Sequence, residues 1–350
     1  MIHKPKILFL YTEIAAYFLA CVKELHSSAD IAIVRWPVNS EAPFKFDFDP
    51  EWQVLDRDTF DEDSLLEYSK AFNPDILVCS GWIDKAYNKT AKHWFGVIPT
   101  VVALDNHYTG SFRQLLGRLI SPIKLKTRFS HVWVPGEPQS EFARKLGYKP
   151  KQILEGFYSA DVNHFDNLYR ETFPQKTKSF PKRFIFIGRY LNFKGIFELW
   201  DAFIEATDGN EEWELWCLGA GDEWDDRKIH PRIKHFGFVQ PDEMKDIIQE
   251  SGVFVLPSHK EPWGVVVHEM AVAGYPMICS NKIGAATKFI SSEKNGIVYE
   301  SGDKNELKSA LKKFIEMPDD ELIKMGEQSH EIGMTHSPEI WKNTILSLLN

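Results

Sequence analysis

The stretch from Ser258 to Pro276, SHKEPWGVVVHEMAVAGYP, constrains the fold more than any other part of the chain. A short apolar run, GVFVLP, precedes it and another begins at Met277, and both are predicted to be buried strands. Between them, apolar residues recur at helical spacing and are followed by helix stop signals: Val265, Val266, Met270, Ala273, then Gly274 and Pro276. The sequence therefore predicts a strand–loop–helix–strand unit whose loop, EPWG, leads directly into a helix.

Short apolar runs alternate with helical patterns along the rest of the chain. Predicted strands cover 6–11, 31–36, 75–79, 99–104 and 131–135, and the alternation restarts at 183–187. This order predicts an α/β chain with parallel sheets covered on both faces. Three further predictions concern the segments in between: Thr12 caps a first helix, residues 37–60 form a long loop or a sheet edge, and residues 167–182 link two domains.

Length and composition restrict the function. A chain of 350 residues is long enough for two domains with cores of their own. Its net charge of −9 argues against general nucleic-acid binding, which relies on cationic contacts to phosphates. The four cysteines lie in apolar segments without metal-ligand spacing, so we expect buried free thiols. With no signal peptide or membrane-spanning run recognised, we expect a cytoplasmic protein.

Two glutamates flank the start of the predicted helix in the EPWG unit. The first turn of a helix offers unpaired N–H groups and a positive dipole end, which together favour a bound anion. Glu261 lies at the mouth of that site, and Glu269 lies about two turns along, leaning back toward it. A diphosphate between two polyhydroxy rings fits this layout. In the alternative interpretation, Glu261 only complements the dipole and Glu269 is solvated.

A second motif, FIFIGRYLNFKGIFELWDAF, places two cations between a strand and a helix. The strand ends near Gly188, and Arg189 and Lys194 precede a helix that begins near Gly195. Lys194 opposes the helix dipole, and a bound anion would reverse that penalty. Ligands of open parallel sheets also collect at the carboxyl ends of strands. We therefore predict a diphosphate clamp, with two solvated surface cations as the alternative.

These motifs resemble those of the retaining glycosyltransferases of family 4, which have the GT-B fold. EPWGVVVHEM resembles the E-x7-E signature and GRYLNFKG the G-R-x4-K-G pattern. LWCLGAGDE resembles the G-x-G turn near the nucleotide, and HFGFVQPDEM the loop that meets the base. The resemblance covers nearly the whole chain. It implies two Rossmann-like parallel-sheet domains facing each other across a cleft: an acceptor-side domain (1–170), a nucleotide-sugar domain (171–335) and a helix crossing back (336–350).

The resemblance also implies a reaction. Such enzymes move a sugar from a nucleotide-diphosphate sugar to a saccharide or lipid-linked hydroxyl, with the anomeric configuration kept and without a metal or other cofactor. Glu261, Arg189 and Lys194 would carry the chemistry, the two cations stabilising the leaving diphosphate. The donor-binding residues it implies are Gly188, Pro262, Trp263, Gly264, Val265, Glu269, Gly219, Gly237, Phe238 and Val239.

The first half of the chain departs from the family pattern. The loop after the first strand, YTEIAA, lacks the usual glycines, and Asp105 occupies the position of the family's histidine, with His107 two residues later. Either residue is a candidate for that catalytic position. A nucleotide-sugar-binding protein without transferase activity is therefore the alternative, and an inverting GT-B enzyme with Glu13 as base is a third. No lysine is placed for a pyridoxal cofactor, which disfavours a phosphorylase.

The segment 113–128 allows two interpretations. It alternates Arg and Lys with Leu and Ile, and no acidic residue occurs from Asn106 to Gly136. Such a helix can lie on an anionic membrane surface, as a peripheral contact at the inner face of the membrane. We favour the other interpretation, an ordinary amphipathic helix whose apolar face packs on the sheet.

Overall fold

The computed structural model describes residues 4–37 and 48–349. Contacts between Cα atoms divide the chain into two units. Unit 1 is Met1–Ser159 with His336–Asn350, and unit 2 is Ala160–Thr335. The predicted linker at 167–182 is wrong for most of its length, because Val162–Lys176 forms helix α6 of unit 2.

Unit 1 contains a seven-stranded sheet in the order β3-β2-β1-β4-β5-β6-β7, and each strand runs parallel to its neighbours. The strands are β1 (Lys6–Tyr11), β2 (Asp30–Arg35), β3 (Gln53–Asp56), β4 (Ile76–Cys79), β5 (Thr100–Ala103), β6 (His131–Val134) and β7 (Ile153–Glu155). The helices are α1 (Ala16–His26), α2 (Glu62–Phe72), α3 (Lys85–Trp94), α4 (Phe112–Lys124), α5 (Glu137–Lys145) and α13 (Pro338–Leu346).

Alternate side chains of β1 face the two cores of unit 1, as the period of two in a strand requires. Leu8 and Leu10 belong to the core covered by α2, α3 and α5, and Ile7 and Phe9 to the core covered by α1 and α13. Trp341 of α13 lies 4.7 Å from Trp133, ring centre to ring centre. The last helix is therefore an integral part of the unit 1 core.

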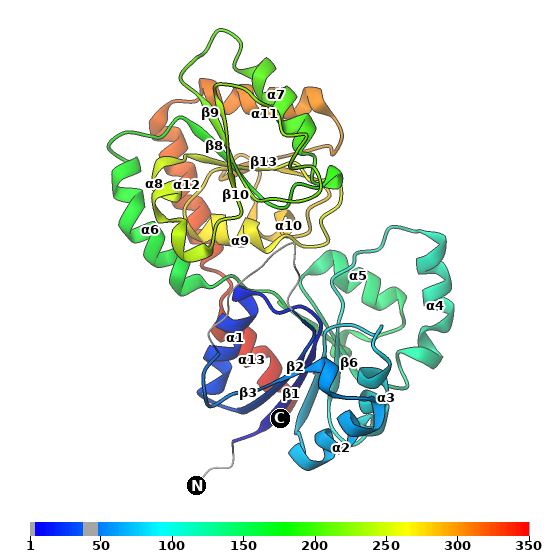
Figure 1. Cartoon of the computed structure of the whole chain (residues 1–350). Helices are drawn as coiled ribbons and strands as arrows, with labels where there is room; N and C mark the ends of the chain where they lie inside the picture. The colour runs from blue at the N-terminus through cyan, green and yellow to red at the C-terminus, as the bar shows by residue number, and fades with distance from the viewer. Residues whose placement is uncertain (1–3, 38–47, 350) are drawn as a thin grey trace. The chain divides into compact units, whose positions relative to one another are not determined.

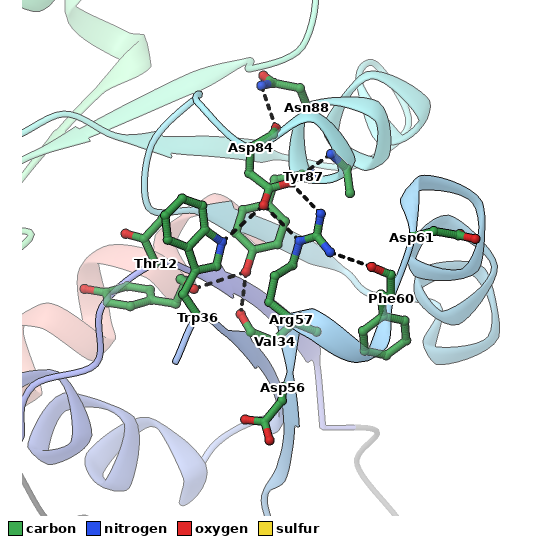
Figure 2. Close-up of polar contacts among 12 residues, drawn as sticks. Thr12, Val34, Trp36, Asp56, Arg57, Phe60, Asp61, Asp84, Tyr87 and Asn88 are labelled. Atoms are coloured by element: carbon green, nitrogen blue, oxygen red, sulfur yellow. Dashed lines mark hydrogen bonds and ion pairs between the residues drawn. The ribbon is translucent and has the colours of Figure 1, made fainter. Parts of the chain in front are cut away.

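A network of side chains fixes the carboxyl ends of β1 to β4 (Figure 2). Arg57 and Asp84 form an ion pair with an Nε–Oδ2 distance of 2.8 Å, and Trp36 Nε1 donates to the same oxygen at 3.1 Å. The Tyr87 hydroxyl donates to the carbonyls of Tyr11 and Val34, both at 3.1 Å. Because these groups come from separate loops, their bonds hold the loops to one another.

Unit 2 contains a six-stranded parallel sheet in the order β10-β9-β8-β11-β12-β13. The strands are β8 (Arg183–Ile187), β9 (Glu214–Leu218), β10 (Ile233–Gly237), β11 (Val253–Leu256), β12 (Met277–Ser280) and β13 (Gly296–Tyr299). The helices are α6 (Val162–Lys176), α7 (Ile196–Ala206), α8 (Lys245–Glu250), α9 (Val265–Val272), α10 (Ala286–Phe289), α11 (Lys304–Glu316) and α12 (Asp319–Gly333). Figure 1 shows α7 and α11 on one face of this sheet, with α6, α8, α9 and α12 on the other.

Two smaller predictions have mixed outcomes, and one helix was not predicted. Thr12 does not cap α1, which begins at Ala16; its hydroxyl pairs instead with the Ser80 hydroxyl at 2.9 Å. Within 37–60, β3 lies at the edge of the sheet, so the edge interpretation is right there, while residues 38–47 lie outside the described part. Helix α12 was not predicted, because its sequence is largely polar.

Candidate functional site

Three glycines end three neighbouring strands of unit 2. Gly188 follows β8, Gly219 follows β9 and Gly237 is the last residue of β10. The Gly219 N–H donates to the Gly237 carbonyl at 2.7 Å, and a Cβ on Gly219 would lie 1.9 Å from the Gly188 oxygen. The φ of Gly219 is +130°, which residues with side chains rarely adopt. Glycine is therefore required at position 219. Gly188, Gly219 and Gly237 together form a row of backbone without side chains at the carboxyl ends of the three strands, which we call the glycine edge.

The loops after β8 and β11 meet beside this edge. The His259 N–H donates to the Phe193 carbonyl at 2.8 Å, and Gly195 packs so closely on Pro257 that a Cβ would lie 2.3 Å from its carbonyl oxygen. These contacts bring Lys194 and Glu261 together as an ion pair. Both side chains are largely buried, with 13% and 15% exposed. Each motif was predicted separately; the pairing of their charges was not.

The EPWG loop begins α9 as predicted. Gly264 has a φ of +87°, and a Cβ there would lie 2.9 Å from the Glu261 Cγ. The first turn of α9 has no side-chain cap, so its N–H groups keep their capacity to bind an anion. Trp263 is buried, and its carbonyl accepts from the Ala285 N–H at 2.9 Å, while Pro262 and Val265 are half-buried. The carboxylate of Glu261 thus lies at the start of the helix.

Glu269 is a half-buried carboxyl group in α9. Burial, and secondarily the charge of Asp161, raise its pKa to about 7. No hydrogen bond to its carboxylate is found within the described residues. Its neighbour His268, which no motif singled out, is buried: Nδ1 accepts from the Ala160 N–H and Nε2 donates to the Gly333 carbonyl, both at 2.9 Å. His268 therefore fixes α9, and Glu269 keeps capacity for a ligand.

The remaining predicted residues of unit 2 lie at the same sheet edge. Arg189 is half-buried directly after Gly188, and Phe238 and Val239 follow the end of β10. Tyr190, which the sequence did not single out, joins two of these loops: its N–H donates to the Ala220 carbonyl at 3.0 Å. Its buried hydroxyl lies 2.8 Å from His235 Nδ1. Tyr190 therefore ties the segment after β8, which carries Arg189, to the loop after β9 and to β10.

The two unit 1 candidates lie in the loop after β5. Asp105 accepts a hydrogen bond from Tyr158, whose pKa is raised by burial first and then by the nearby Tyr17 and Asp105. The carbonyl of His107 accepts from Gln114 Nε2 at 2.8 Å. Asp105 is thus a carboxylate among tyrosine hydroxyls. Asp105 and His107 both stay candidates for the catalytic position of unit 1.

The described residues show neither a cluster of metal-ligand side chains nor a helix able to cross a membrane. Residues 4–37 and 48–349 contain no group of three or more His, Cys, Asp or Glu arranged to hold a metal ion. No helix in that part of the chain has the length and hydropathy needed to cross a membrane.

Comparison with known proteins identifies the unit that carries this site. The sequence profile described as Glycosyl transferases group 1 matches residues 169–331. A Methanocaldococcus jannaschii protein named uncharacterized glycosyltransferase MJ1607 is 31% identical over 123 residues, which cover 33% of this chain and 31% of the relative. The lipopolysaccharide core biosynthesis glycosyltransferase LpsE of Rhizobium meliloti is 28% identical over 153 residues, 41% of this chain and 42% of LpsE. The matches therefore span less than half the length of these two relatives.

The whole chain resembles solved structures in fold. The crystal structure of Anabaena Alr3699/HepE in complex with UDP and glucose superposes with a TM-score of 0.74, covering 99% of both chains at 16% identity. At that identity the likeness establishes the fold alone, and it confirms the predicted GT-B class with two parallel-sheet units. The stretch that matches the glycosyl transferases group 1 profile, residues 169–331, lies within unit 2 and contains both sequence motifs, in agreement with the resemblance seen in the sequence.

Proposed function

We propose that the protein is a retaining glycosyltransferase that moves a sugar from a UDP- or GDP-sugar to a hydroxyl of a saccharide or lipid-linked acceptor. The observation that carries this proposal is the buried Lys194–Glu261 pair beside the glycine edge. It unites the two sequence motifs at the carboxyl ends of parallel strands, where ligands of such sheets bind. Both residues fall within the segment that matches the family profile.

Each group has a role that follows from its chemistry. Arg189 and Lys194, with the N–H groups at the start of α9, stabilise the charge that grows on the departing diphosphate. Lys194 then divides its charge between the phosphate and Glu261. The Glu261 carboxylate accepts hydrogen bonds from hydroxyls of the donor sugar, and Glu269 from those of the ribose. The glycine edge lets the nucleotide approach the backbone, with Gly237, Phe238 and Val239 beside the base.

The relatives support particular choices of donor and acceptor. HepE was crystallised with UDP and glucose, which favours a UDP-sugar as the first donor to test. LpsE is named for lipopolysaccharide core biosynthesis, which favours an acceptor in a cell-surface glycolipid or polysaccharide. We further propose a cytoplasmic location and a reaction that needs no metal or other cofactor.

The decisive experiment measures release of free nucleotide from UDP-, GDP- and ADP-sugars with a mixed acceptor pool. Wild type is compared with Glu261→Ala, Arg189→Ala and, as a matched control, Glu250→Ala, an exposed carboxylate of the same unit. Turnover of one donor that the first two substitutions abolish and the control retains is the expected result. Addition of a chelator leaves that turnover unchanged.

Other outcomes select the other candidates. Donor binding without turnover of any acceptor favours a nucleotide-sugar-binding protein, which the glycine-free loop after β1 motivates. A product with inverted anomeric configuration contradicts the retaining mechanism and makes Glu13 the base to test. Absence of donor binding in folded protein would refute the nucleotide-sugar assignment altogether.

A further inference from the structure

Helix α4 of unit 1 carries a stripe of large apolar side chains that no other described residue of this unit covers. Its members recur at i, i+3, i+4, i+7, i+8 and i+11, and they are Phe112, Leu115, Leu116, Leu119, Ile120 and Ile123. The least exposed of them is 39% exposed, and Phe112 and Leu119 are each 78% exposed. We call this set the α4 stripe. Isolated exposed apolar residues are ordinary, but a contiguous stripe of this kind marks a binding surface.

The opposite side of α4 attaches the helix to unit 1. Ser121 is buried, and its hydroxyl donates to the Leu146 carbonyl at 2.9 Å. Leu125, directly after the helix, is also buried. At about 100° per residue, both positions lie roughly 150–170° from the centre of the stripe. The stripe therefore points away from unit 1, and Figure 1 shows α4 at the outer edge of that unit.

This orientation overturns the packed-helix interpretation that the sequence favoured. An amphipathic pattern reveals that a helix has an apolar face, but it does not say what that face contacts. Among the described residues, the Ser121 hydroxyl and the Leu125 side chain provide the buried attachment, and the six-residue apolar face is left outside.

Charge selects the partner of the stripe. Arg118 and Lys124 are exposed and lie on either side of it, about 110–130° from its centre. The segment from Asn106 to Gly136 contains no acidic residue, although the chain as a whole has a net charge of −9. A second copy of the chain docking stripe to stripe would bring these cationic flanks together in an isologous contact, which like charges oppose. An anionic lipid surface satisfies both the apolar stripe and its basic flanks.

We propose that α4 is a membrane-docking helix that lies in the headgroup region of an anionic lipid bilayer, with the α4 stripe toward the acyl chains. The helix docks unit 1 at the surface and does not span it. If the proposed transferase function holds, docking brings the enzyme to acceptors that are carried by lipids. The docking itself does not depend on that function, because it can be measured without donor or acceptor.

Co-sedimentation with vesicles tests the proposal. The full chain is mixed with vesicles of phosphatidylcholine alone or of phosphatidylcholine with phosphatidylglycerol. Wild type is expected to bind the anionic vesicles. Substituting Leu119→Gln and Ile123→Gln together should lower the partition coefficient at least about tenfold, since two apolar side chains lose their burial in lipid. Arg118→Gln with Lys124→Gln should lower it roughly 30-fold at low salt, at about fivefold for each charge.

Val97→Gln is the matched control, because Val97 is an isolated apolar side chain of unit 1 that is 70% exposed. This variant should bind like wild type. All substituted side chains are exposed, so each variant should melt at the same temperature as wild type. Measuring this temperature shows directly whether a loss of binding comes from misfolding. Failure of wild type to bind anionic vesicles, or binding that the Leu119/Ile123 variant retains, refutes the proposal. A wild-type dimer that this variant converts to monomer, without lipid binding, also refutes it and assigns the stripe to self-association.

Discussion

The carboxylates at the carboxyl ends of the strands are paired differently in the two sheets. In unit 1, the carboxylate of Asp84 accepts from Arg57, from Trp36 and from the N–H groups of Ala86 and Tyr87 (Figure 2). Burial opposes its ionisation, but the hydrogen bond from Arg57 leads the opposing effects, and the pKa of Asp84 is lowered. In unit 2, Glu261 has one cation, and Glu269 has no hydrogen-bond partner among the described residues.

This difference distinguishes carboxylates that stabilise the fold from carboxylates that remain available to bind a ligand. A buried carboxylate whose lone pairs are all used stabilises the loops that supply its donors. A carboxylate whose pKa lies near 7, or one that is paired with a single flexible lysine, keeps hydrogen-bonding capacity for a ligand and contributes less to the stability of the fold. We therefore expect substitutions at the two edges to affect different measurements.

The largest effect is expected at Glu261. Glu261→Ala should lower kcat/KM by about a thousandfold, because it removes contacts that are strengthened in the transition state. Its effect on the free energy of unfolding should be small, about 1 kcal/mol, since Lys194 has a long flexible stem that can carry its charge to water. Donor turnover and urea unfolding measure the two quantities. A variant that unfolds readily but retains turnover would place Glu261 among the structural charges.

Arg57 should show the opposite behaviour. Arg57→Met leaves the Asp84 carboxylate buried without its cation, and we expect a loss of about 3 kcal/mol in the stability of unit 1. Unlike the flexible Lys194 side chain, the Asp84 carboxylate cannot move out into water, because it also caps α3. Amide hydrogen exchange reports the two units separately, and donor affinity should stay within about twofold. The double variant Arg57→Met/Asp84→Asn, which keeps a capping oxygen, should recover part of the loss. Equal losses in the single and double variants would argue against the network.

A substitution in the glycine edge should have an effect of intermediate size, on both stability and donor binding. Gly219→Ala places a methyl group against the Gly188 carbonyl at a φ of +130°, and we expect about 3 kcal/mol of destabilisation together with weaker donor binding. Gly209→Ala is the matched control: its φ is +78°, but no atom lies within 4 Å of the added methyl group. That control should cost only about 1 kcal/mol. If the two variants are equally stable, the close backbone contact at Gly188 contributes nothing.

The sequence allowed prediction of whatever is encoded locally. The strand runs, the glycine turns and the E-x7-E helix are each contained in about twenty residues. The Lys194–Glu261 pair joins positions 67 residues apart, and it exists because the sheet order places β8 beside β11. The Arg57–Asp84 network likewise depends on which loops meet at one edge.

Other features were missed because local signals misled or were silent. Pro174 and the polar residues around it are typical of a linker, yet Pro174 lies within α6. This helix is held in unit 2 because Phe173 packs against Gly274 and Gly326. Helix α12 buries only a few side chains, so its pattern is weak. For α4 the pattern was correct, but periodicity cannot state whether an apolar face lies inside or outside.

The smallest effect is expected at Glu269, where pH provides the test. Its pKa of about 7 lies above the unfolded value of 4.5, so the folded state binds the proton more tightly. The resulting stabilisation is fully present below pH 4.5 and is lost as pH rises through 7, a total of at most about 3 kcal/mol. Glu269→Gln, which stays neutral, should therefore be more stable than wild type at pH 8.5, and this advantage should vanish at pH 4.5.

Donor affinity should move in the other direction with pH. If the ionised carboxylate accepts hydrogen bonds from ribose hydroxyls, wild-type donor affinity rises as pH passes 7, while that of Glu269→Gln stays flat and weaker. Urea unfolding and equilibrium donor titration at the same pH values measure both trends. Opposite slopes would show that this edge gives up stability to keep a charge available for a ligand. Parallel unfolding curves for the two proteins would mean that ionising the half-buried Glu269 carboxyl costs no stability, and they would contradict this trade-off.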